Sequence, residues 1–505
     1  MLPLWWPCLI LVLLISNVQA QQCDNTFPGN FSDFSAILMD QRVYLTGGNS
    51  DTIDVWSLDL STGVDQSCPH WEPPPSDTSS SSSSSITVAP YLYGVAFAGP
   101  NESIYVQSGD RGTTEMDNMV VYNMSSASWH QAAVDATSQL PQSRAEMSAT
   151  ANSTTQVAWF YGGRSTEERQ QAGEQLYYND FYNFDMQTGV WSWPTIRYAW
   201  GQRPARYGHK AVLVSGQLFI LGGKTAIRNV SDDSWIFGEA DFQSVLVFDT
   251  IKNKAVTMAT IGDTPDGKLD FSATLAPDGK SIVVFGGINV EQPTDQNEED
   301  QSSHTVSQDL FVLDVCTLSW STPMVTGTAP SARAGHEAVT YGNYMLVMMG
   351  YDSDGNFVND IGILNLATWE WVDSIPGDED EPQPVQPDCR FTFPHMPDNG
   401  GDNGGDGGDE PKVISNPNQS NHTTAKAVGI SLGIVGFLAC AGAAVFLFLR
   451  YRKNARTPNP RWLPRPSIMK KETSSSTPPP PSSTTNTDQP NPTITTTTTT
   501  NNEPA

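Results

Sequence analysis

Histidine, cysteine and clustered acidic residues are the side chains of this chain whose types favour metal binding or catalysis. His209 and His336 each follow Arg-x-Gly, which indicates a repeated structural position. Four further histidines show no metal-ligand spacing such as His-x-x-x-His; they are His70, His130, His304 and His395. The acidic stretches 291–300 and 378–381 lack the ordered alternation of a calcium loop. We therefore expect no catalytic residue, no metal and no cofactor.

The six cysteines divide by their surroundings. Cys8 and Cys440 lie in apolar runs, which leaves four that are available for pairing: Cys23, Cys68, Cys316 and Cys389. An even number in a chain exported to an oxidising compartment predicts two disulfide bonds, for which three pairings exist.

Asn-X-Ser/Thr sequons, which accept N-linked glycans in the secretory pathway, occur only before residue 427. They are Asn30, Asn101, Asn123, Asn152, Asn229, Asn418 and Asn421. The Asn- and Thr-rich C-terminal segment has none. This one-sided distribution predicts N-glycosylation of the part of the chain that lies outside the cell or in a lumen.

Residues 1–20 predict a removed signal peptide, because an apolar run at 9–15 is followed by Ala20, a small residue that suits a cleavage site. The positive charge usual at the start of such a signal is missing, which leaves a retained anchor as the alternative. The run is short for a membrane span, which favours cleavage.

Residues 427–449 carry no charge and are long enough, as a helix, to cross a hydrocarbon core of about 30 Å. Arg450, Arg452 and Lys453 follow directly, so the C-terminal side is predicted to face the cytosol. The chain is thus expected to be a single-pass type I protein of the plasma membrane or an endomembrane. A Gly429-x-x-x-Gly433 spacing in the span permits helix pairing and a homodimer.

Two further segments have the composition of unfolded chain. Residues 396–426 are rich in Gly and Asp and are predicted to form a flexible stalk. Residues 450–505 become a Ser/Thr/Pro/Asn tract and are predicted to be a disordered cytoplasmic tail. A formal net charge of -28 repels phosphate backbones, so no nucleic-acid partner is expected.

An internal repeat dominates residues 23–395. In each unit an apolar strand ends in Gly-Gly, a loop and a second strand ending near Asp follow, and a Trp comes about ten residues later in most units. The glycines are Gly47, Gly48, Gly162, Gly163, Gly222, Gly223, Gly286 and Gly287. Degenerate pairs occur at Ser108-Gly109 and Met349-Gly350. The tryptophans are Trp71, Trp129, Trp191, Trp320 and Trp371. Six units therefore recur at intervals of roughly 60 residues.

This pattern resembles the kelch repeat, and the chain is similar to proteins with attractin- or muskelin-like kelch propellers. The resemblance implies an all-β, six-bladed propeller over residues 23–395, each blade a four-stranded antiparallel sheet. The diglycine would supply backbone freedom at the end of the second strand, and the Trp of the fourth strand would be buried between blades.

The same resemblance supplies a rival function, because galactose oxidase is a secreted propeller of this kind. That copper enzyme needs a cysteine-linked tyrosine, a second tyrosine and two histidines, an arrangement that the scattered histidines do not offer. The main expectation is a binding platform for adhesion, recognition or scaffolding, and the alternative is a carbohydrate-active enzyme of the secretory pathway.

Propeller topology also predicts a binding face. The loops between the second and third strands of a blade, the b–c loops, would lie on one face, opposite the a–b and c–d turns. Three consecutive b–c loops are long, at 163–179, 223–242 and 287–307, which favours a protein or glycan ligand there over tolerated insertions. Asn229 lies within one of these loops and weakens the inference.

Blade positions also bear on the disulfides. Cys68 would lie on the first blade and Cys316 on the fifth, beyond the permitted Cα separation of about 7 Å. This excludes Cys68 with Cys316 and, if all four are bonded, Cys23 with Cys389. Of the two pairings that are left, we favour Cys23 with Cys68 and Cys316 with Cys389.

Overall fold

The computed structural model describes residues 28–48, 53, 55–74, 86, 88–107, 109–110, 119–173, 175–198, 203–289, 305–377 and 390–393. The chain divides into two compact units, residues 1–400 and 401–505, and every described residue belongs to the first. Within these described ranges no helix has the length and apolar character needed to cross a membrane. The predicted signal peptide, stalk, span and tail (1–20, 396–426, 427–449 and 450–505) lie outside them.

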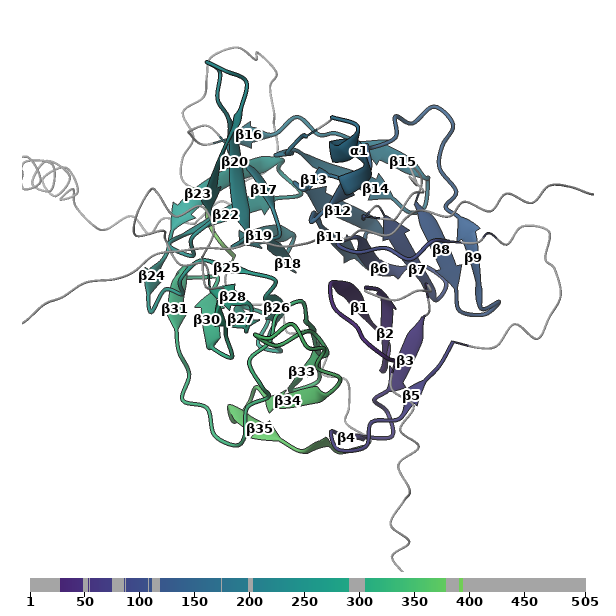
Figure 1. Ribbon diagram of the computed structural model, residues 1–505, viewed down its shortest axis with the longest axis vertical. Coiled ribbons are helices and arrows are strands. Elements are labelled where there is room, and N and C mark those ends of the chain that lie inside the picture. Colours follow the sequence, from purple (N-terminus) through teal and green to yellow (C-terminus); the bar gives the residue numbers. More distant parts are fainter. Residues whose placement is uncertain are drawn as a thin grey trace, which may run out of the picture. The chain divides into compact units, whose positions relative to one another are not determined.

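Six sheets stand around a common centre, each built from one continuous stretch of chain and antiparallel in its four main strands (Figure 1). Four have four strands, and two carry a fifth at the outer edge. Among the described residues the single helix is α1 (Glu167–Gln171). The all-β prediction is confirmed.

The strands of the six blades follow the order of the chain from the centre outward. The innermost strands are β1 (Phe34–Met39), β6 (Val95–Gly99), β11 (Ser148–Asn152), β18 (Lys210–Val214), β26 (Ser272–Leu275) and β32 (Glu337–Tyr341). The second strands are β2 (Arg42–Gly47), β7 (Ser103–Gln107), β12 (Val157–Tyr161), β19 (Gln217–Leu221), β27 (Ser281–Phe285) and β33 (Tyr344–Met348). The third strands are β3 (Trp56–Asp59), β8 (Val120–Asn123), β14 (Phe181–Asp185), β22 (Ser244–Asp249), β30 (Leu310–Asp314) and β34 (Ile361–Asn365). The fourth strands are β5 (Trp71–Glu72), β9 (Ser128–Gln131), β15 (Val190–Ser192), β23 (Lys254–Ala259), β31 (Ser319–Ser321) and β35 (Glu370–Val372).

The hydrophobic core lies between neighbouring blades. One cluster joins Val247 of β22 to Val284 of β27, and another joins Leu45 of the first blade to Leu346 of the sixth. Every residue of β33 is buried, which explains why this strand consists of Tyr, Met, Leu and Val side chains. The five predicted tryptophans are buried in these fourth strands. In the fourth blade the corresponding position, opposite Phe248, is held by the buried Ala255.

The ring closes between the first and last blades. Each innermost strand contacts the next, and β32 contacts β1. At the periphery, β36 (Ser374–Ile375) pairs with β4 (Val64–Asp65), so the chain after the sixth blade is fastened to the first. Similar peripheral pairs bring the connectors β16 (Arg197–Tyr198) and β24 (Ile261–Gly262) alongside β23 and β31. These outer pairings had no signal in the repeat pattern.

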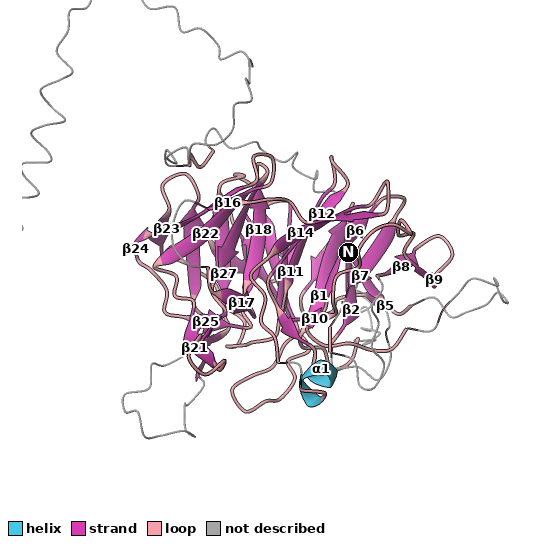
Figure 2. Cartoon of the chain, turned by 90° about the horizontal axis from the view of Figure 1, so that it is seen from above, coloured by secondary structure: helices cyan, strands magenta, loops and turns pink. Residues whose placement is uncertain are grey.

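Several b–c loops carry small sheets of their own on one face of the propeller, where α1, β21 and β25 lie together (Figure 2). We call this the b–c face. Its sheets comprise β10 (Arg144–Ala145) with β13 (Arg164–Ser165), β17 (Ala205–Tyr207) with β20 (Lys224–Arg228) and β21 (Trp235–Glu239), and β25 (Lys268–Leu269) with β28 (Ile288–Asn289) and β29 (Thr305–Val306).

Candidate functional site

The diglycines adopt a left-handed backbone where the second strand of each blade meets its b–c loop. Gly162 has φ 67°, and a Cβ there would collide with the carbonyl oxygen of Arg206 in the next blade. The other predicted glycines also have positive φ: Gly47, Gly48, Gly163, Gly222, Gly223, Gly286 and Gly287. These residues therefore let adjacent blades approach closely.

The Arg-x-Gly-His segments join each blade to its neighbour. Arg333 donates to the Met349 carbonyl at 3.2 Å, inside its own blade. His336 lies 2.9 Å from the hydroxyl of Ser272 in the preceding blade, and His209 lies 2.8 Å from that of Ser148. Burial lowers the pKa of both histidines well below the usual value, so they are neutral and structural at physiological pH.

A ring of backbone hydrogen bonds surrounds the central axis on the b–c face. A residue one position before β1, or two positions before each of the other innermost strands, has φ between 51° and 63°. These residues are Asp33, Tyr93, Glu146, Gly208, Asp270 and Gly335. In five of the six steps around this ring, the N–H of one blade donates to the carbonyl of another at 2.9–3.3 Å. The Gly of Arg-x-Gly-His is thus a ring position.

Acidic side chains of this ring line a small central chamber of about 80 Å³. Burial and the nearby charge of Asp270 raise the pKa of Asp33 to about 8, and burial also raises the pKa of Asp270. Both have internal partners, because Ser32 donates to Asp33 and Tyr351 donates to Asp270. Over the described ranges, no group of three or more His, Cys, Asp or Glu side chains is arranged to hold a metal ion.

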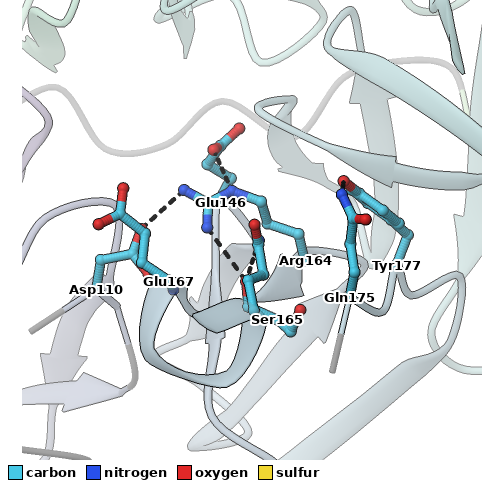
Figure 3. A network of polar contacts seen from close by, with 8 residues as sticks. Asp110, Glu146, Arg164, Ser165, Glu167, Gln175 and Tyr177 are labelled. Carbon is cyan, nitrogen blue, oxygen red and sulfur yellow. Dashed lines mark hydrogen bonds and ion pairs between the residues drawn. The ribbon is translucent and has the colours of Figure 1, made fainter. Parts of the chain in front are cut away.

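Arg164 connects the ring to the b–c loop of the third blade (Figure 3). Its guanidinium donates to Glu146 at 2.6 Å and to Asp110 of the second blade at 2.7 Å. Asp110 also accepts the backbone N–H of Glu167, at the start of α1. This largely buried ion pair fixes the loop from which Tyr177 extends toward the fourth blade.

Tyr177 begins an aromatic cluster that spans two blades. Its ring centroid lies 5.1 Å from Tyr207, 5.0 Å from Trp235 and 5.2 Å from Phe237. The Trp235 indole N–H donates to the Gln175 carbonyl at 3.0 Å. The cluster holds β20 and β21, with their turn at 229–234, against the third blade; we call these two strands and their turn the blade-4 hairpin.

The blade-4 hairpin presents apolar side chains to solvent. Val230 at its tip is 97% exposed, Ile236 is 56% exposed and Phe237 is 50% exposed. A hollow of about 460 Å³ lies on one side, where Tyr198 and Arg203 meet Trp235. A second hollow of about 570 Å³ is formed with Leu176 and Phe237. The length of the loop at 223–242 signalled this feature, but nothing in the repeat signalled its hairpin form.

Three predicted glycosylation sites lie on turns opposite the b–c face. Asn101 lies in an a–b turn, Asn152 ends β11 directly before an a–b turn, and Asn123 ends β8 directly before a c–d turn. Asn229 lies in the turn of the blade-4 hairpin, and the side-chain amide of Asn359, in a b–c loop, donates to Asn30. Asn418 and Asn421 lie outside the described residues.

Of the four predicted disulfide cysteines, Cys68 and Cys316 are described, and both are disulfide-bonded. Cys68 follows β4 of the first blade, and Cys316 lies in the turn after β30 of the fifth. Cys23 and Cys389 lie outside the described residues.

A family model for the KLHDC2/KLHL20/DRC7 Kelch-repeats domain matches residues 94–241 and 236–393, more than half of the chain. The chain belongs to the kelch-repeat family. The match supports the kelch resemblance drawn from the diglycines and tryptophans, and it does not extend to the attractin- or muskelin-like subgroup.

Curated relatives share the kelch region. The chain is 25% identical over 299 residues to Acyl-CoA-binding domain-containing protein 4 of Arabidopsis thaliana, covering 57% of this chain and 39% of the relative. It is 29% identical over 208 residues to Kelch domain-containing protein 2 of Bos taurus, covering 39% of this chain and 48% of that protein. The chain therefore spans less than half the length of these two relatives. A solved structure, described as the structure of YjhT, matches with a TM-score of 0.50 and 15% identity, over 68% of this chain and 98% of that one, which supports the fold.

Proposed function

We propose that this kelch propeller is a non-enzymatic binding platform that holds a protein partner on its b–c face, at the blade-4 hairpin. The observation that carries the proposal is the exposure of Ile236 and Phe237 beside two hollows on a hairpin that the rigid propeller supports. Kelch membership supports a binding role, because this architecture serves many unrelated partners.

The chemistry of the hairpin favours protein over glycan. Trp, Tyr and Arg dominate the energetics of protein interfaces, and Trp235, Tyr177 and Arg203 line one hollow together. The guanidinium carbon of Arg203 lies 3.8 Å from the centroid of the Tyr198 ring, and this cation–π contact orients the guanidinium at the hollow. Exposed apolar side chains around such groups suit a partner that buries its own apolar surface.

We further propose that the platform is the extracellular or luminal part of a single-pass type I membrane glycoprotein. The uncharged run at 427–449, the basic residues after it and the sequons before it support this topology. Disulfide bonds at Cys68 and Cys316 fit an oxidising compartment. Pairing of the spans through Gly429 and Gly433 belongs to the same proposal.

For the disulfides we propose Cys316 with Cys389, and therefore Cys23 with Cys68. Phe391 is buried in the cluster that contains Cys316, and its carbonyl accepts from Gln217 at 3.0 Å. Arg390 pairs with Asp249 at 3.0 Å. These contacts hold the chain next to residue 389 against the fourth and fifth blades. Non-reducing peptide mapping decides the pairing, and a Cys23–Cys389 linkage contradicts it.

The binding proposal is tested in intact cells by proximity labelling from the full chain. In one variant a Gly-Asn turn replaces residues 226–237, and in the matched control the same turn replaces the exposed c–d turn at 250–253 on the opposite face. We expect the hairpin variant to lose specific labelled proteins that purified native protein binds directly, and the control to retain them. Retention of all of them by the hairpin variant overturns the proposal. Loss after glycosidase treatment of the partner, with its polypeptide intact, would identify a glycan ligand and overturn it also.

A further inference from the structure

We infer that the partner docks as an extended segment that adds to the free edge of β21, forming a fourth strand of the β17–β20–β21 sheet. This inference depends on the proposed binding platform. β21 pairs along its whole length with β20, from Arg228 opposite Trp235 to Lys224 opposite Glu239. Across the described part of the chain, no strand pairs with the other edge of β21. Backbone groups on that edge can pair with an incoming strand.

The edge of β21 lacks the usual protection. Natural edge strands are shielded by lysine, proline, a bulge or a covering loop, because an apolar edge recruits other strands. The sequence of β21 is Trp-Ile-Phe-Gly-Glu, which contains no lysine or proline. All five residues pair with β20 on the other edge. Ile236 and Phe237 are half-exposed on opposite faces of the strand. Because successive side chains of a strand point to opposite faces, a partner strand with methyl-bearing side chains at every position, such as valine alternating with threonine, would cover both.

Acidic residues lie at both ends of this apolar edge. Asp232 and Asp233 precede it, and Glu239 and Asp241 come at and after its end. A hydrogen bond from Ser234 lowers the pKa of Asp232, and one from Arg228 lowers the pKa of Asp233, so both are ionised at neutral pH. Charge complementarity therefore selects a segment with Lys or Arg at both ends of an apolar centre.

The same charges disfavour a second copy of this chain as the occupant. Antiparallel pairing of two β21 strands would bring Asp232 and Asp233 of one copy opposite Glu239 and Asp241 of the other. Like charges directly opposite destabilise a strand pair. The structure thus points to a segment of a different protein.

The probe is a synthetic fluorescent peptide in which valine alternates with threonine and a Lys-Arg pair closes each end. Its binding to the full chain is measured by fluorescence anisotropy. Two comparison peptides have the same side chains but carry N-methyl groups on alternate residues, one on the odd-numbered and the other on the even-numbered residues. Alternate N–H groups of a strand point to opposite edges, so only one of these peptides loses the hydrogen bonds to β21. A third carries Asp-Glu pairs at its ends. We expect at least a tenfold loss of affinity for one N-methylated phase and for the acidic peptide.

Protein variants locate the site. Phe237→Lys places a charge on the edge and is expected to weaken binding at least tenfold, whereas Ile251→Lys changes a 70% exposed isoleucine on the opposite face and is expected to leave it unchanged. Equal loss in both variants overturns the inference, as does concentration-dependent dimerisation of the chain through β21.

The outcomes separate this inference from the platform proposal. If Phe237→Lys abolishes binding and neither N-methylated phase does, the hairpin is a platform but strand addition is wrong. If the parent peptide does not bind at all, strand addition of this chemistry is overturned, while the labelling experiment with the replaced hairpin still tests the platform by itself.

Discussion

The imidazole of His336, the residue just before the innermost strand of the sixth blade, lies 2.9 Å from the hydroxyl of Ser272 on the innermost strand of the fifth. His209 and Ser148 make the same contact between the fourth and third blades. Both histidines are almost completely buried. The repeated Arg-x-Gly-His segment therefore forms a joint between blades.

Removing this joint is expected to destabilise the propeller. Ser272→Ala leaves a buried imidazole nitrogen without its partner, which costs about 1–3 kcal/mol of unfolding free energy. The measurement is urea unfolding of the full chain at neutral pH. Ser128→Ala is the matched control, because Ser128 also lies 2.9 Å from a histidine, His130, in a less buried pair. An equal loss in both variants would contradict the joint.

Arg164→Met is expected to cost about 3–5 kcal/mol, because it leaves Asp110 and Glu146 without their shared cation in a poorly solvated place. Arg42 also bridges two carboxylates, Asp59 and Glu72, but the Glu72 side chain is 58% exposed. Arg42→Met should cost no more than about 1 kcal/mol. Thermal unfolding of the two variants compares them. Similar melting temperatures would contradict the prediction that loss of Arg164 costs more stability than loss of Arg42.

The stability of the propeller should fall as pH rises from about 4 to about 8. Asp33 holds its proton to about pH 8 in the folded chain but releases it near pH 4 when unfolded, so the folded state binds more protons over this interval. Asp33→Asn should therefore reduce the fall in melting temperature over this interval. Asp65→Asn changes an exposed aspartate whose pKa a Ser67 hydrogen bond lowers, and it should not reduce the fall. A wild-type melting temperature that rises steadily from pH 4 to pH 8 would show that Asp33 does not dominate.

Gly162→Ala should be far more damaging than Gly355→Ala. Both glycines have positive φ, which costs an alanine about 1–2 kcal/mol. At Gly162 the new Cβ also meets the Arg206 carbonyl, whereas nothing lies within 4 Å at Gly355. Overpacking adds about 1–3 kcal/mol at Gly162 alone. Chemical unfolding of the two alanine variants measures the gap, and equal stabilities would mean that the blades do not depend on this close approach.

The sequence predicted the blades because their chemistry is local and repeated. A diglycine such as Gly286-Gly287 and a tryptophan such as Trp320 mark the same position in most units, and the kelch match agrees with them. The backbone ring could not be predicted in this way. Gly208 and Gly335 occupy it, but so do Asp33 and Tyr93, which give no sign of a left-handed backbone.

The candidate site was predicted only in outline. Loop length at 223–242 pointed to the face on which the blade-4 hairpin lies, since topology fixes where b–c loops emerge. The blade-4 hairpin depends on contacts between loops of different blades, such as Tyr177 with Trp235. The repeat pattern carries no information about such contacts, because the loops vary from unit to unit. The pairing of β36 with β4 is also non-local and was missed for the same reason.

Site-specific photo-crosslinking in intact cells tests the binding face most directly. A benzophenone amino acid replaces Ile236 on the blade-4 hairpin in one form of the full chain and Ile251 on the opposite face in another, both at exposed isoleucines. The platform predicts discrete covalent adducts with a protein partner from position 236 and none from 251. Adducts from 251 alone, or the same adducts from both positions, would contradict it.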